Sequence, residues 1–191
     1  MLKLFPGRSK FAGLKFPMRP LFEIATDPHA QADVLRARSH GVIEVRDGRL
    51  RRVRLRPFPK IVSLPEIMLL GEQYHRRRAG DRCLLFYDQP RRFPNFLSLK
   101  YVLSARDTTL ASIRTALRAL DEIARLKGSD AIVCDVFNWR ISERLLGRLG
   151  WESHKPSRWH RHYIKRFYGD WPAPLAPGEL TGDFPPREKR A

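Results

Sequence analysis

Apolar and polar positions in the second half of the chain form blocks that predict a strand, a loop and a helix in turn. Residues 96–103 are apolar and rich in β-forming side chains, so they predict a strand. The polar sequence Arg106-Asp107-Thr108-Thr109 ends this pattern and contains side chains that cap helices. Apolar residues then recur at helical spacing up to Lys127, and Gly128 is expected to end the helix.

The following blocks predict a buried strand, a short helix and a closing hairpin. Residues 131–136 are apolar without interruption, which is typical of a strand covered on both faces. A helix over residues 141–149 precedes strands at 151–154 and 159–167. From Gly169 the chain is rich in proline and ends in basic residues, so residues 169–191 are expected to form a disordered tail.

The first half of the chain predicts elements on both sides of a hairpin. Asp47-Gly48 is a strong turn signal between two strands, residues 42–45 and 50–56. Before the hairpin we expect a strand at residues 21–25 and a helix at 28–39 that begins at Asp27-Pro28. After it we expect a helix at residues 64–75 and a strand at 83–87. With 191 residues in the chain, we expect a single α/β domain over residues 21–168, preceded by a basic flexible arm, residues 1–20.

The charge balance adds a second signal. The chain has 37 Lys and Arg residues against 20 Asp and Glu residues, a formal net charge of +17. This excess attracts polyanions, namely nucleic acid, an anionic membrane surface or phosphorylated ligands, although an Arg-rich proteome produces the same excess. Apolar runs are too short to predict a transmembrane segment.

The two cysteines, Cys83 and Cys134, lie alone in apolar runs. Isolated cysteines form neither a disulfide framework nor a zinc knuckle, so they indicate buried free thiols in a reducing cytoplasm. Nothing near Cys134 in the sequence activates it as a nucleophile.

The loop after the strand at 96–103 is a candidate ligand site, because unpaired N–H groups at the start of a helix can hold a phosphate or diphosphate. The order of elements around it and the residues Arg106-Asp107-Thr108-Thr109-Leu110-Ala111 resemble the GNAT superfamily of N-acetyltransferases. In that family a Gln/Arg-x-x-Gly-x-Gly/Ala loop binds the diphosphate of acetyl-CoA. Arg106 and Ala111 match the first and last positions, and Thr109 replaces the central glycine.

Two later features also resemble this family. Asn138 follows the predicted strand, and Gly150-Trp151 follows the predicted helix, where the family has an Asn and a Gly-Phe. The tyrosine that is a frequent general acid in the family corresponds to Leu146, which cannot donate a proton. A different group, such as water or Tyr163, would then protonate the leaving thiolate.

The resemblance implies a GNAT-like α/β (α+β) fold, with a mixed, mostly antiparallel sheet flanked by helices. It also implies an acyl-CoA-dependent acyltransferase that moves an acetyl or related acyl group to an amine. Acetyl-CoA would contact the end of one strand, the loop after it and an asparagine. The implied residues are Val102, Leu103, Ser104, Arg106, Asp107, Thr108, Thr109, Leu110, Ala111 and Asn138.

Basic and aromatic side chains are interleaved most densely in residues 159–168. In a strand, His160 and His162 share one face, and Tyr163 lies on the other. Three interpretations stay open: a hairpin with aromatic side chains in the core and solvated charges, an acceptor groove with a histidine general base, and a platform for bases and phosphates. The candidate catalytic residues are His160, His162 and Tyr163.

Other chemistries have less support in the sequence. His154, His160 and His162 have too few acidic or thiol neighbours and too many arginines around them to predict a metal site. Further candidates for a general base, among which the sequence does not choose, are Glu66, Glu72, His75 and Asp135. The competing function is a non-catalytic basic module that binds RNA or DNA on a degenerate GNAT-like fold.

Overall fold

The structure, a computed structural model, describes residues 22–58, 79–136, 141–154, 161–175 and 179. Several sequence predictions lie outside these residues. They are the basic arm, the helix at 64–75 with its candidate bases Glu66, Glu72 and His75, and the site candidates Asn138 and His160.

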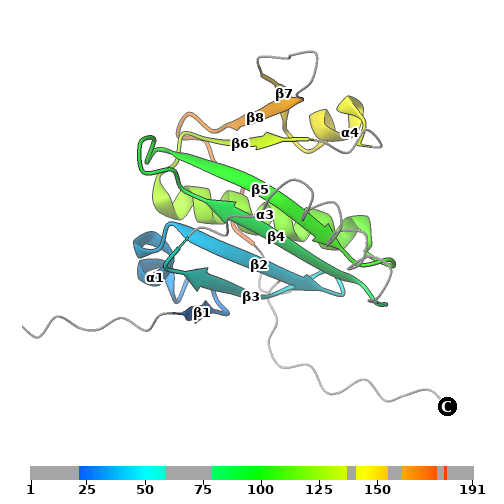
Figure 1. Ribbon diagram of the computed structural model, residues 1–191, viewed down its shortest axis with the longest axis horizontal. Helices are drawn as coiled ribbons and strands as arrows, with labels where there is room; N and C mark the ends of the chain where they lie inside the picture. Colours follow the sequence, from blue (N-terminus) through cyan, green and yellow to red (C-terminus); the bar gives the residue numbers. More distant parts are fainter. Residues whose placement is uncertain (1–21, 59–78, 137–140, 155–160, 176–178, 180–191) are drawn as a thin grey trace, which may run out of the picture.

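The described strands form one eight-stranded sheet in the order β1-β3-β2-β4-β5-β6-β8-β7 (Figure 1). The strands are β1 (Glu23–Ala25), β2 (His40–Arg46), β3 (Arg49–Arg56), β4 (Arg82–Asp88), β5 (Phe96–Ser104), β6 (Ala131–Asp135), β7 (Glu152–Ser153) and β8 (His162–Arg166). Strands β5 and β6 are parallel, and the other neighbouring pairs are antiparallel. The predicted mixed, mostly antiparallel sheet flanked by helices is therefore confirmed.

The described helices are α1 (Ala32–Ala37), α3 (Leu110–Lys127) and α4 (Glu143–Arg148). Helices α1 and α3 lie together on one face of the sheet, and α4 lies near its β6–β7 end (Figure 1). The core fills the space between α3 and the sheet, and its fully buried side chains include Ile43, Val53, Leu85, Leu97, Leu120, Ile123 and Ile132. No helix in the described part of the chain is long and apolar enough to cross a membrane.

Both ends of α3 follow the sequence prediction. Thr109 is the N-cap residue, and its Oγ1 accepts a hydrogen bond from the Ser112 amide at 3.2 Å. Gly128 ends the helix with a left-handed φ of 63°, and its N–H donates to the carbonyl of Arg125 at 3.1 Å. Local side-chain and backbone chemistry thus sets the length of α3.

The Asp47-Gly48 turn joins β2 and β3 as predicted, with φ values of 50° and 74° that match a tight hairpin turn. The turn also packs on α3. The Gly48 amide donates to Ser112 Oγ at 2.9 Å, and the Gly48 carbonyl accepts from Thr115 Oγ1 at 2.7 Å. The hairpin is thereby fixed to the first turns of the helix.

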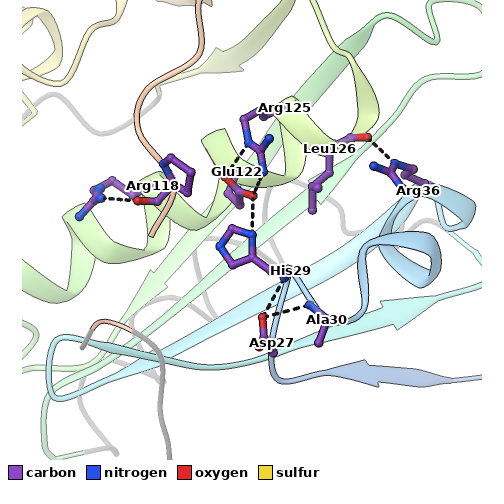
Figure 2. A network of polar contacts seen from close by, with 9 residues as sticks. Asp27, His29, Ala30, Arg36, Arg118, Glu122, Arg125 and Leu126 are labelled. Carbon is purple, nitrogen blue, oxygen red and sulfur yellow. Dashed lines mark hydrogen bonds and ion pairs between the residues drawn. The ribbon is translucent and has the colours of Figure 1, made fainter. Parts of the chain in front are cut away.

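Helix α1 begins at Ala32, later than the predicted start at Pro28. Asp27 caps the preceding turn instead, because its carboxylate accepts from the amides of His29 at 2.8 Å and Ala30 at 3.3 Å (Figure 2). The His29 ring then reaches α3, where Nδ1 lies 3.5 Å from the buried Glu122 carboxylate. Arg125 donates to the same carboxylate, with Nε at 3.0 Å.

The first residues after Gly169, where the sequence analysis places the start of the tail, pack against the domain. Trp171 Nε1 donates to the carbonyl of Ser129 at 3.2 Å, and Leu175 is buried. Arg118 on α3 donates to the carbonyl of Pro174 at 3.2 Å and pairs with Glu179. The packed part of the chain therefore extends at least to Leu175.

A buried ion pair joins β8 to α3. Lys165 Nζ lies 2.6 Å from Asp121 Oδ2, and the two side chains are 15% and 7% exposed. Burial raises the pKa of Asp121, and the nearby Lys165 ammonium offsets part of that effect. The neighbouring Arg166 pairs with Glu152 on β7, whose side chain is 64% exposed.

We expect Lys165→Met to destabilise the protein by about 3 kcal/mol, because the Asp121 carboxylate would stay buried without its partner. The adjacent Arg166→Met breaks a far more exposed pair and should cost less than about 1 kcal/mol. Both values are measurable by urea denaturation. Equal losses in the two variants would contradict this account of the buried pair.

The loss in Lys165→Met should also depend on pH. Without the ammonium, the folded-state pKa of Asp121 rises further above its unfolded value, so the unfolded chain releases this proton first as pH increases. The stability deficit should therefore be larger at about pH 7 than at about pH 5. A deficit that does not change with pH would contradict this origin.

Candidate functional site

Strands β5 and β6 separate part of the way along β5 (Figure 1). Their pairing runs from Phe96 opposite Ala131 to Leu99 opposite Cys134, while β5 itself continues to Ser104. A β-bulge lies at the same place: β4 residues Phe86 and Tyr87 face Tyr101 and Leu99, so Lys100 is the extra residue. The bulge bends β5 where its partner ends.

A cleft of about 320 Å³ opens at this separation. It is lined by side chains from both parallel strands, from β8 and from the residue after β7. These residues are Ser98, Leu99, Lys100, Val133, Cys134, Asp135, His154, His162 and Tyr163. The cleft therefore lies where two parallel strands diverge, and none of the predicted cofactor-binding residues in the described part of the chain is among those that line it.

His162 and Asp135 contact each other in the cleft, with Nδ1 of the imidazole against Oδ1 of the carboxylate. The residues are directly opposite each other in the antiparallel β6–β8 pair, so both side chains lie on the same face of the sheet. Their side chains are 40% and 42% exposed, which leaves the pair accessible from the cleft. Asp135, one of several possible bases by sequence, is thus the carboxylate partner of a predicted catalytic candidate.

Tyr163 also lines the cleft, but its polar atom has other partners. Its hydroxyl accepts a hydrogen bond from Arg161 Nη2 at 3.1 Å and donates to Glu143 Oε1 at 3.2 Å. The residue is 3% exposed and belongs to the core. Of the candidates in the described residues, His162 combines a reactive nitrogen with exposure to the cleft.

The loop between β5 and α3 contains four of the ten predicted cofactor-binding residues, and the donors of Thr108 and Thr109 among them are used within the protein. The Thr108 amide donates to the carbonyl of Ala105 at 3.3 Å, and the Thr108 hydroxyl donates to the carbonyl of Arg82 at 2.7 Å. The Asp107 carboxylate accepts from the Gly80 amide at 3.0 Å. These contacts fix the loop to the segment before β4.

Asp81, which the sequence analysis does not name, contacts the predicted site residue Thr109. Its carboxylate accepts hydrogen bonds from the Thr109 amide at 3.0 Å and from the Thr109 hydroxyl at 2.8 Å. Burial raises the pKa of Asp81, but hydrogen bonds from Ser112 and from the Thr109 amide and hydroxyl outweigh it and lower the pKa below its usual value. A carboxylate therefore lies at the N-terminus of α3 at neutral pH.

The loop and the strand differ in how well they fit coenzyme A. The diverging edge of β5 suits an extended amide-containing arm, because main-chain groups continue beyond the last residue that pairs with β6. The loop does not suit a diphosphate, because the Thr109 amide already donates to the negatively charged Asp81. The site thus matches one part of this ligand and not the other.

Cys134 lines the cleft as a thiol. Burial raises its pKa to about 12, and the negative charge of Asp135 acts in the same direction. At neutral pH the sulfur is therefore protonated and a poor nucleophile. This agrees with the absence of an activating residue in the sequence.

The basic and aromatic side chains of β8 are used inside the protein. Tyr163 and Phe167 are buried, so their rings are not available to stack on bases. Lys165 pairs with Asp121, and Arg166 pairs with Glu152. Within residues 161–167, Tyr163 and Phe167 therefore belong to the core, whereas His162 is exposed to the cleft.

The described residues include no group of three or more His, Cys, Asp or Glu side chains placed to hold a metal ion. His154 Nδ1 lies 3.5 Å from Arg166 Nη2, and His162 pairs with Asp135.

Comparisons with known proteins add little to this geometry. No protein-family model and no curated protein matches the chain. Among solved structures, the chain is similar to the crystal structure of nourseothricin acetyltransferase, with 12% sequence identity and a TM-score of 0.38, over 77% of this chain and 99% of that chain. A TM-score of 0.38 carries no argument, so the description of the fold and of the site depends on the strand pairing given above.

Cys134 should react slowly with alkylating reagents in the folded protein. In a Cys83→Ala background, we expect its reaction with iodoacetamide at about pH 8 to be roughly a hundredfold slower, or more, than in the unfolded chain. The rate can be followed by mass spectrometry. Labelling of the folded protein at the rate of the unfolded chain would show that the thiol is neither buried nor protonated.

Proposed function

We propose that the cleft between β5 and β6 transfers an acyl group from a thioester of the pantetheine type to an amine. The observation that supports this function is the end of β5–β6 pairing at the Lys100 bulge, directly beside the His162–Asp135 pair. The cleft combines the point where the edge of β5 becomes unpaired, at Lys100, with the candidate base His162.

The donor would lie along the diverging edge of β5. Its amides can hydrogen-bond to the main chain between Lys100 and Leu103, in the way that a short strand extends a sheet. Val102, a predicted contact, is 41% exposed at this part of the strand. The thioester would then lie near Lys100, at the closed end of the cleft.

His162 would act as the general base. Nδ1 of the imidazole contacts the Asp135 carboxylate, so Nε2 is the nitrogen that takes up a proton. The carboxylate orients the ring and stabilises the imidazolium that forms. Asp135 is therefore a positioning residue in this proposal.

The reaction balances with these groups. The amine nitrogen forms a bond to the thioester carbonyl carbon, and the carbon–sulfur bond breaks. The proton lost from the amine passes to His162, and the thiolate takes a proton from solvent. Leu146, at the position of the GNAT tyrosine, is buried on α4 and has no proton to donate.

His162→Ala should lower kcat for acyl transfer by about 10² or more, the usual effect of losing a general base. Asp135→Asn should have a smaller effect on kcat and should shift the pH profile, because the imidazole would lose its negatively charged partner. The assay is release of free thiol from acetyl-CoA or S-acetyl-pantetheine in the presence of a panel of primary amines.

His29→Gln is the matched control, because His29 contacts Glu122 on the helical face and is not among the cleft residues. Unchanged rates in His162→Ala, with normal folding, would exclude His162 as the base. The competing function, a non-catalytic module for RNA or DNA, predicts salt-sensitive heparin binding and no thiol release with any acceptor.

A further inference from the structure

The N-terminus of α3 already has an anion bound to it, and that anion belongs to the protein. Asp81 accepts both donors of Thr109, at 3.0 Å from the amide and 2.8 Å from the hydroxyl. The main chain of Asp81 is fixed as well, since its carbonyl accepts from the Asp47 amide at 3.0 Å. Asp81 is therefore held on two sides, its carbonyl by the hairpin turn and its carboxylate by the start of the helix.

A diphosphate would meet unfavourable charge at this place. The dipole of α3 attracts an anion to the first turn of the helix, and the Asp81 carboxylate already satisfies that attraction. A second carboxylate, Asp107, belongs to the same loop and is fixed by the Gly80 amide at 3.0 Å. Like charges a few ångströms apart repel, and because Asp107 and Thr109 are exposed, water and the neighbouring Arg106 reduce this repulsion.

We infer that this site recognises its acyl donor through the pantetheine arm and not through the diphosphate of coenzyme A, because Asp81 fills the anion position at the start of α3. This inference rests on the proposed function. The ligand class is a pantetheine thioester, and the arm can be free, part of coenzyme A, or attached through its phosphate to a carrier protein.

The test compares the dissociation constants of coenzyme A and pantetheine by calorimetry, for the native protein and for two variants. The native protein should prefer coenzyme A less than about tenfold. Asp81→Ala removes the charge and releases the Thr109 amide, so the preference for coenzyme A should rise about tenfold or more, with pantetheine affinity unchanged.

Asp81→Asn guards against misfolding in the alanine variant. Asparagine retains an acceptor for the Thr109 amide and a donor for the Thr109 hydroxyl, so it removes the charge and keeps the cap. Its preference for coenzyme A should rise less than that of Asp81→Ala. Asp33→Asn, a change of the same charge at an exposed residue of α1, should behave as the native protein does.

Two results would overturn the inference and leave the proposed function intact: a native preference for coenzyme A above about tenfold, or the same preference in the native protein and both Asp81 variants. If neither ligand binds any of these proteins, the proposed function fails and the inference fails with it. If pantetheine does bind, a further assay distinguishes a free arm from one attached to a carrier protein. It compares the rate of acetyl transfer from S-acetyl-pantetheine with the rate from an acetylated phosphopantetheine carrier protein.

Discussion

The architecture of the site depends on one constraint: two neighbouring parallel strands cannot be joined by a tight turn. The chain must leave the end of β5, cross the sheet, and start β6 beside the beginning of β5. Helix α3 makes this crossing with 18 residues, a length of about 27 Å. The crossing therefore starts from the loop at residues 105–109, which follows the end of β5 that does not pair with β6.

The same crossing places the cleft and the loop at different positions along β5. Pairing between β5 and β6 holds at the start of β5 and stops at Leu99, so the strands diverge toward Ser104. Residues 100–104 cover about 13 Å between the bulge and the loop. An extended arm along β5 would therefore have its reactive end near His162 and its distal end near Thr109.

Local signals predict the parts of this arrangement that local chemistry determines. The Asp47-Gly48 turn, the Thr109 cap and the Gly128 end of α3 follow from dihedral preferences and side-chain donors within a few residues. Alternation along β8 also places His162 and Tyr163 on opposite faces of the sheet. In the observed register, His162 is opposite Asp135 and Tyr163 is opposite Cys134. The sequence could not show that Tyr163 is buried with Glu143 and Arg161 as partners.

Contacts between distant residues determine the rest. Asp81 and Thr109 are 28 positions apart, and no local pattern links an acid before one strand to the cap of a later helix. The bulge at Lys100 arises because β5 has one residue more than β4 between two paired positions. The sequence of either strand alone does not show this difference. The late start of α1 is local by contrast, since Asp27 caps the turn that precedes the helix (Figure 2).

The replacement of the GNAT glycine by Thr109 and the position of Asp81 at the start of α3 are physically coupled. A glycine at position 109 would let a phosphate approach the backbone, but it has no side chain with which to cap α3. The Thr109 hydroxyl caps the helix by accepting a hydrogen bond from the Ser112 amide, and the same hydroxyl donates a hydrogen bond to Asp81. The threonine and the aspartate therefore form one unit that satisfies the helix N-terminus from within the chain. The loop is therefore stabilised without a ligand phosphate, and the diverging edge of β5 is the part of the site that these contacts leave for an extended ligand.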